Sequence, residues 1–299
     1  MRPIRALVIY LVAVFIGGSL LAPWLWWLAH FVAPGYPAIA KAPFHRFVDR
    51  SFLLIALAGL WPLLRELGAT SWREVGLVSP AGQLKKLGGG LLLGFGSLAI
   101  VAVLALGGHN REFAPNLTTH KIAGALLSAA VTAAVVATLE EILFRGGVFG
   151  GLRRLLPWKV ALGISSAVYA LVHFLQRSEL TGPVRWNSGL ALLPQILAGF
   201  ADWHQLVPGF FNLTLAGILL GLAYQRTGNL YFSIGLHAGW IFWLKIYGAF
   251  TTAAAPAVSW FWGTGKMIDG WLALVVLSLT LALLNYPPLL SRQPPRSPP

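Results

Sequence analysis

Long apolar runs separated by short basic segments constrain this chain more than any other feature of its sequence. The first run extends from Ile4 to Phe31, and similar runs recur almost to the C-terminal end. About 20 apolar residues suffice for a helix to cross the hydrocarbon core of a bilayer. Lipid offers the backbone no hydrogen-bond partner, so a segment of this kind must form its hydrogen bonds within itself, as a helix does. We therefore expect an all-α, polytopic membrane protein.

The runs predict about eight transmembrane helices in a single integral membrane domain that occupies residues 1–299. They cover residues 4–31, 47 or 51 to 64, 87–106, 121–145, 158–175, 208–224, 230–247 and 271–284. A further apolar piece, 190–200, is too short to span and is expected at the interface. Glycines in 87–106 predict close helix packing. The Pro-rich tail, about 288–299, is expected to be disordered.

The low charge content and the absence of cysteine exclude several classes of function. Charged residues make up only 10% of the chain, against roughly 25% in soluble proteins. The net charge of +13 is scattered between apolar runs, a pattern typical of membrane topology and anionic lipid headgroups and not of nucleic-acid binding. There is no cysteine, which excludes disulfides, thiolate catalysis and zinc–thiolate sites. With both termini cytoplasmic, the inner segments hold 13 of the 22 Lys and Arg residues, as the positive-inside rule favours.

The sequence Glu140-Glu141-x-x-x-Arg145 lies at the end of the fourth apolar run. Ionisable residues inside a span are costly, so they indicate a functional site. Glu141 and Arg145 are four residues apart on one helix face and can pair. Glu140 lies about 100° around the helix, away from that pair. One carboxylate is therefore expected to be neutralised and structural, whereas Glu140 is expected to carry the chemistry.

Polar residues on the next three spans reach a depth similar to that of Glu140. The depth of each residue can be counted from the nearest basic residue on the inner side. Glu140 precedes Arg153 by 13 positions, and His173 follows Lys159 by 14. Asn212 precedes Arg226 by 14 positions, and His237 follows it by 11. At 1.5 Å per residue these separations correspond to roughly 16–21 Å of helix. Tyr169 lies one turn before His173 and on the same face. We expect these groups to converge on one buried polar site.

A carboxylate with two imidazoles supports two chemistries. In one, Glu140 is a general base that activates water with His173, and His237 donates to the oxyanion that develops on an attacked carbonyl. In the other, Glu140, His173 and His237 hold a divalent metal such as zinc, with one position open for water. The sequence contains no His-Glu-x-x-His motif, so the metal-free mechanism is favoured. A proton-coupled transporter would use the same residues, but no inverted repeat is evident.

The ordered set Glu140-Glu141-x-x-x-Arg145, Tyr169-x-x-x-His173 and His237 resembles the CAAX protease and bacteriocin-processing (Abi) family of intramembrane proteases. The resemblance covers about 71–247, including the segment Trp72 to Leu77. It implies a membrane endopeptidase that cleaves prenylated or membrane-associated peptides. It also implies that Glu140 is the catalytic glutamate, Glu141 and Arg145 its supporting partners, His173 the water-handling histidine and His237 the oxyanion-side histidine.

Two positions depart from the family pattern. Tyr169 stands where the family usually has Phe, and Ile241 stands four residues after His237, where Asn or Asp is usual. An aliphatic side chain cannot donate a hydrogen bond to an oxyanion. Either activity is reduced, or another donor substitutes, for which Asn212 is our candidate. The alternative is a non-catalytic family member that binds or scaffolds membrane peptides.

Overall fold

The computed structural model describes residues 2–32, 35–36, 42–115, 117–175, 178–198, 203–254 and 258–285. The predicted disordered tail, 288–299, lies outside these residues. The chain divides into two compact units, residues 1–70 with 172–203, and residues 71–171 with 204–299. The single membrane domain expected from the sequence stays a prediction.

The first unit contains an N-terminal helix that packs against α4 and α9. This helix comprises α1 (Arg2–Val12), a π-helical turn η1 (Ala13–Gly17) and α2 (Gly18–Val32); α4 is Phe44–Glu66 and α9 is Ser188–Leu197. The core of the unit consists of Ala22, Phe44, Val48, Leu192 and Ile196. At 10 residues α9 is too short to span a bilayer, as predicted for this apolar piece.

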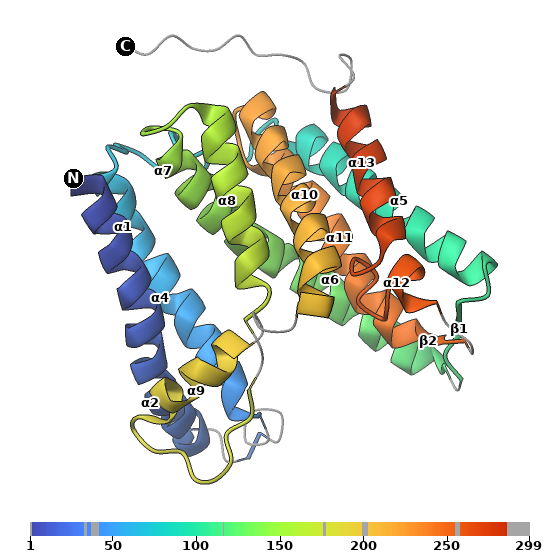
Figure 1. Ribbon diagram of the computed structural model, residues 1–299, viewed down its shortest axis with the longest axis horizontal. Helices are drawn as coiled ribbons and strands as arrows, with labels where there is room; N and C mark the ends of the chain where they lie inside the picture. Colours follow the sequence, from blue (N-terminus) through green and yellow to red (C-terminus); the bar gives the residue numbers. More distant parts are fainter. Residues whose placement is uncertain are drawn as a thin grey trace. The chain divides into compact units, whose positions relative to one another are not determined.

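The second unit contains the helices that carry most of the predicted site. Its elements are α5 (Leu84–Gly107), β1 (Arg111–Phe113), α6 (Thr119–Glu141), η2 (Ile142–Phe149), α7 (Gly150–Leu152), α8 (Trp158–Val172), α10 (Trp203–Thr227), α11 (Tyr231–Phe250), β2 (Thr251–Ala253), α12 (Ser259–Trp262) and α13 (Trp271–Asn285). The main core lies among α5, α10, α11 and α13 (Figure 1) and includes Leu98, Leu219, Leu236 and Val276. The sequence did not predict the antiparallel pair β1–β2, which joins Arg111–Phe113 to Thr251–Ala253.

Within the described residues, four helices are long and apolar enough to cross a membrane. They are Arg5–Val32, Phe44–Glu66, Leu84–Gly107 and Thr119–Leu152. The last continues through the glycines after Arg145, beyond the predicted end of the fourth span. Helices α8 and α13 have 15 residues each, about 22 Å at 1.5 Å per residue, and are shorter than a typical hydrocarbon core of ~30 Å. The structure therefore supports a multi-pass membrane protein, whereas the count of eight spans stays a prediction.

Glycines bring α5 and α11 into backbone contact. A Cβ at Gly90 or Gly94 of α5 would collide with the backbone of Phe232 or Leu236 on α11. A Cβ at Gly239 would lie 2.5 Å from the Phe95 nitrogen on α5. Small residues four apart allow helices in lipid to approach this closely. The packing predicted for these glycines is thus confirmed at Gly90 and Gly94, and it fixes the position of α11, which carries His237.

Helix α6 buries a stripe of small residues that leads to Glu141. Its buried positions are Ala129, Ala133, Ala137 and Glu141, spaced four residues apart. Large apolar side chains such as Leu127 and Val131 are 68% and 56% exposed on other faces, as suits a lipid-facing surface. The same stripe that packs α6 into the unit therefore directs Glu141, and not Glu140, towards the interior.

Candidate active site

Glu141 and Arg145 form a buried ion pair at the start of a π-helical segment. The Arg145 Nη1 atom lies 3.0 Å from Glu141 Oε1, and the side chains are 3% and 0% exposed. The pairing predicted from their spacing is thus confirmed. The π-helix Ile142–Phe149 begins directly after Glu141 and contains Arg145. Such segments are rare and occur frequently at functional sites.

Arg145 is held by more than Glu141. Its guanidinium lies 4.3 Å from the ring centre of Tyr169 on α8. Its Nη2 atom contacts the Gly217 carbonyl on α10 at 3.5 Å. A Cβ at Gly217 would lie 2.9 Å from Ser166 Cα, so glycine permits the close approach of α10 to α8. In the sequence, Gly217 is a small residue between apolar ones, a pattern that does not by itself assign it to the site.

His237 on α11 lies against both glutamates. Its Nδ1 atom is 2.9 Å from Glu141 Oε1, and its Nε2 atom is 3.8 Å from Glu140 Oε2. Glu141 is an acceptor because it pairs with Arg145, so Nδ1–H donates to it and Nε2 faces the opposite side of the ring. A carboxylate that fixes the orientation and tautomer of a histidine in this way is a recurring feature of catalytic and metal sites.

The side chains of Glu140 and Glu141 differ in how much of their surface is exposed. The Glu140 side chain is 24% exposed, whereas that of Glu141 is 0% exposed. Of the two carboxylates, Glu140 is thus the one whose side chain is partly exposed.

Tyr169 completes the contacts of the histidine. Its hydroxyl lies 3.3 Å from His237 Nε2, and the residue is 3% exposed. Phe144 packs edge-on against the Tyr169 ring, with centroids 5.2 Å apart. A phenylalanine at position 169 would keep this packing and lose the polar contact.

A small cavity of about 30 Å³ adjoins Tyr169 and His237. Asn212, Trp240 and six apolar residues complete its lining. On this scale a water needs ~10–15 Å³ and two to four polar partners, so the cavity has room for one. Asn212 reaches this cavity, but its Nδ2 atom donates to the Ile268 and Gly270 carbonyls at 2.8 and 2.9 Å. To donate to an oxyanion, Asn212 would have to give up one of these bonds.

His173 and Ile241 are the remaining positions that the sequence singled out. His173 follows α8 directly and is exposed, but it belongs to the first unit, so its convergence with Glu140 stays a prediction. Ile241 is half-buried and packs against the apolar cluster that includes Ala137 and Leu162. It offers no hydrogen bond to the site.

A catalytic zinc site typically has three protein ligands and one position open for water. Among the described residues, no group of three or more His, Asp or Glu side chains could hold a metal ion. Glu141, the carboxylate nearest to His237, is already paired with Arg145. The predicted ligand set of Glu140, His173 and His237 includes a residue of the first unit, and it stays an alternative.

Apolar helices around a buried cluster of Glu, Arg, Tyr and His define a multi-pass membrane protein with a polar site inside its hydrophobic segments. Residues 122–243 match the family model described as type II CAAX prenyl endopeptidase Rce1-like. Residues 122–243 thus form a domain of this CAAX protease family, and the resemblance seen in the sequence is confirmed over this range. Its extension to about residue 71, with the segment Trp72 to Leu77, stays a prediction. The matched range contains Glu140, Glu141, Arg145, Tyr169, His173, Asn212 and His237. No curated protein and no solved structure matches the chain.

Proposed function

We propose that this protein is an intramembrane endopeptidase of the CAAX-processing type, which hydrolyses a peptide bond of a prenylated or membrane-associated peptide. The observation that carries the proposal is the position of His237 between Glu140 and the Glu141–Arg145 pair. The family match adds the substrate class, peptides or proteins at the membrane. The eight-span topology with cytoplasmic termini, and a peptidase core from about 71 to 247, belong to the same proposal.

Glu140 is the proposed general base. It takes a proton from a water molecule, the water oxygen attacks the scissile carbonyl carbon, and the carbonyl oxygen becomes an oxyanion. When the carbon–nitrogen bond breaks, the proton passes from Glu140 to the leaving amine. His173, four residues after Tyr169 along the chain, is proposed to orient the water.

His237 and Tyr169 are the proposed donors to the oxyanion. Because Nδ1–H is donated to Glu141, Nε2 is the nitrogen of His237 that can face a substrate. Donation from this atom requires that it also carries a proton. The Tyr169 hydroxyl, 3.3 Å from Nε2, is a second donor on the same side of the ring. We therefore propose that Tyr169 and His237 share the oxyanion role, and Asn212 supports them from the cavity wall.

The decisive substitution is Glu140→Gln, which keeps the shape of the side chain and removes the base. The full-length protein would be reconstituted in lipid nanodiscs with a quenched fluorogenic peptide whose farnesylated cysteine precedes three residues. Loss of a general base typically costs ~10²–10⁴-fold in rate, and we expect a loss in turnover of that size. Glu112→Gln, which changes an exposed carboxylate on β1, is the matched control and should retain parental activity.

The same assay tests the other parts of the mechanism. His173→Ala should also lower turnover if His173 orients the water. Chelators should have no effect; if they abolish activity and zinc restores it, the metal-dependent alternative replaces this mechanism. Equal turnover of Glu140→Gln and the parent would disprove the assigned role of Glu140.

A non-catalytic, peptide-binding family member remains the second candidate because Ile241 gives no hydrogen bond where the family usually has Asn or Asp. The Asn212 amide is also occupied by two carbonyls. If the parent protein binds the farnesylated peptide but never cleaves it, this second function is correct.

A further inference from the structure

Arg111 is a buried cation that lies outside the candidate active site. It is 9% exposed and lies on β1, immediately after α5. Its Nε and Nη2 atoms donate to Thr251 Oγ1 at 3.1 and 2.8 Å, and Nη2 also donates to the Thr251 carbonyl at 2.7 Å. Its guanidinium lies 5.2 Å from the ring centre of Tyr247. These neutral partners orient Arg111 without neutralising it.

The positive charge of Arg111 has no carboxylate partner in the described part of the chain. The neighbouring Glu112 is exposed, and side chains alternate between the two faces of a strand. Asp269 uses its two carboxylate oxygens to bind the backbone nitrogen and the hydroxyl of Thr264. Buried charges are costly unless they are paired, so the surroundings of Arg111 favour an anion that the chain itself does not supply.

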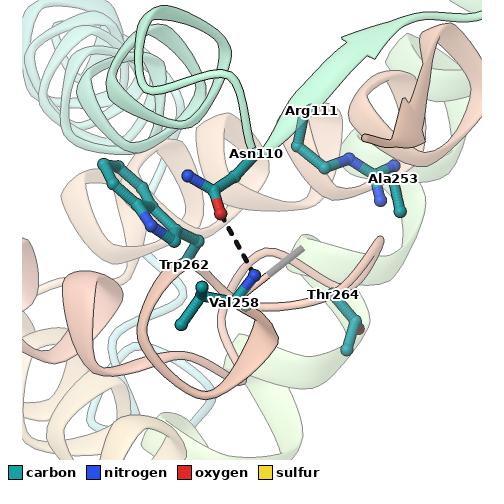
Figure 2. Close-up of a pocket in the computed structure, with 7 residues that line it drawn as sticks. Asn110, Arg111, Ala253, Val258, Trp262 and Thr264 are labelled. Atoms are coloured by element: carbon teal, nitrogen blue, oxygen red, sulfur yellow. Dashed lines mark hydrogen bonds between the residues drawn. The ribbon is translucent and has the colours of Figure 1, made fainter. Parts of the chain in front are cut away.

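A cavity of about 100 Å³ lies beside Arg111. It is lined by Asn110, Arg111, Ala253, Val258, Trp262, Gly263 and Thr264. Figure 2 draws these residues as sticks and labels all of them except Gly263. Asn110 Oδ1 accepts a hydrogen bond from the Val258 backbone nitrogen and so holds the α12 segment against β1. Val258 is 43% exposed, and Ala253 and Thr264 are exposed too, so the cavity reaches the surface. Its volume is several times the ~10–15 Å³ that one water needs.

The cavity lies at the ends of apolar helices. Helices α5 and α11 end at Gly107 and Phe250, and α13 begins at Trp271. Trp260 and Phe113 nearby are 65% and 69% exposed. Exposed aromatic side chains at the ends of spans are typical of the membrane–water interface, where lipid phosphates lie.

We propose that this cavity binds the phosphate of an anionic membrane lipid headgroup. Arginine matches phosphate oxygens with paired hydrogen bonds, and Arg111 is already oriented by Thr251. The apolar walls, Val258 and Trp262, then contact the first carbons of the lipid. Because Arg111 connects β1 to β2 through Thr251, a bound lipid stabilises the end of α11.

Thermal unfolding of the full-length protein in detergent tests this proposal, with dioleoyl phosphatidylglycerol added to the micelles. Dioleoylglycerol, which has the same acyl chains and no phosphate, is the lipid control. A ligand that binds only the folded state raises Tm, and a rise of about 5 °C is expected with phosphatidylglycerol alone. Arg111→Gln should abolish the rise. Arg73→Gln, which changes an exposed arginine, should keep it.

A second variant keeps the test decisive if Arg111→Gln fails to fold. Val258→Phe narrows the cavity but leaves Arg111 and the backbone bond to Asn110 intact, and it should also remove the rise in Tm. Native mass spectrometry should then detect fewer retained phosphatidylglycerol molecules than on the parent. The proposal is wrong if both variants keep the full rise and the retained lipid. An Arg111-dependent shift with inorganic phosphate, and none with phosphatidylglycerol, would overturn the assignment to lipid.

Discussion

At the scale of single residues, the neighbours Glu140 and Glu141 have different surroundings. Glu141 is fully buried and its Oε1 atom meets both Arg145 and His237, at 3.0 and 2.9 Å. Glu140 retains 24% exposure and approaches the far side of the same histidine, at 3.8 Å. Removal of one partner from a buried ion pair typically costs ~3–5 kcal/mol. Changes at Glu141 should therefore affect folding more strongly than changes at Glu140.

Tyr169 and Ile241 provide a prediction at this scale. If the Tyr169 hydroxyl replaces the missing donor at position 241, Tyr169→Phe should lower kcat by ~10²–10³, as expected for loss of an oxyanion donor. Substrate binding should change little, because the ring and its contact with Phe144 remain. The measurement is kcat and KM for the farnesylated peptide, after thermal unfolding has shown that the variant folds.

Ile241→Asn is the matched companion of that variant. It restores the usual donor and should recover most of the activity that Tyr169→Phe loses. Asn212→Ala in the same assay distinguishes the two candidate donors. If Asn212→Ala abolishes activity and Tyr169→Phe does not, the oxyanion role belongs to Asn212.

At the scale of helices, the position of His237 depends on the glycine contact between α5 and α11. The two helices approach at Gly90 and Gly94 on one side and at Gly235 and Gly239 on the other. His237 lies between the latter two glycines, and Trp240 Nε1 on the same helix donates to Ser97 Oγ of α5 at 2.9 Å. A displacement of α11 along or away from α5 would therefore move His237 relative to the glutamates on α6.

Gly94→Ala tests this dependence. The added methyl group would collide with the Leu236 backbone, and overpacking of this kind typically costs ~1–3 kcal/mol. We expect lower thermal stability together with lower turnover. Gly96→Ala on the same helix is the control, because no atom lies within 4 Å of a Cβ there. Equal stability and turnover of the two variants would show that the close contact does not position His237.

At the scale of the whole molecule, the orientation in the membrane decides from which side a substrate reaches the site. The basic residues favour cytoplasmic termini, which places the segment before α5 inside and the segment before α6 outside. The chain contains no cysteine, so a single introduced thiol reports its own location without background.

Labelling of intact cells with a membrane-impermeant maleimide tests the orientation. Thr119→Cys, an exposed position at the start of α6, should react in intact cells. Ala81→Cys, an exposed position before α5, should react only after lysis. The reversed pattern would place the termini outside and would contradict the orientation inferred from the charges.

The sequence by itself determined the membrane class, the approximate helix bounds and the pairing of Glu141 with Arg145. These properties follow from local patterns, namely the length of apolar runs and the four-residue spacing along one helix. The stripe of Ala129, Ala133 and Ala137 would also have predicted which glutamate is buried.

Only the tertiary structure decided how side chains from different helices meet. Tyr169 faces His237 Nε2, Gly217 offers its carbonyl to Arg145, and Asn212 gives its amide to carbonyls near α13. The β1–β2 pair and the cavity beside Arg111 also join segments about 140 residues apart in the chain. The rotation of a helix about its axis, and its displacement along that axis relative to a neighbouring helix, are set by packing over many residues. A local sequence pattern therefore does not determine them.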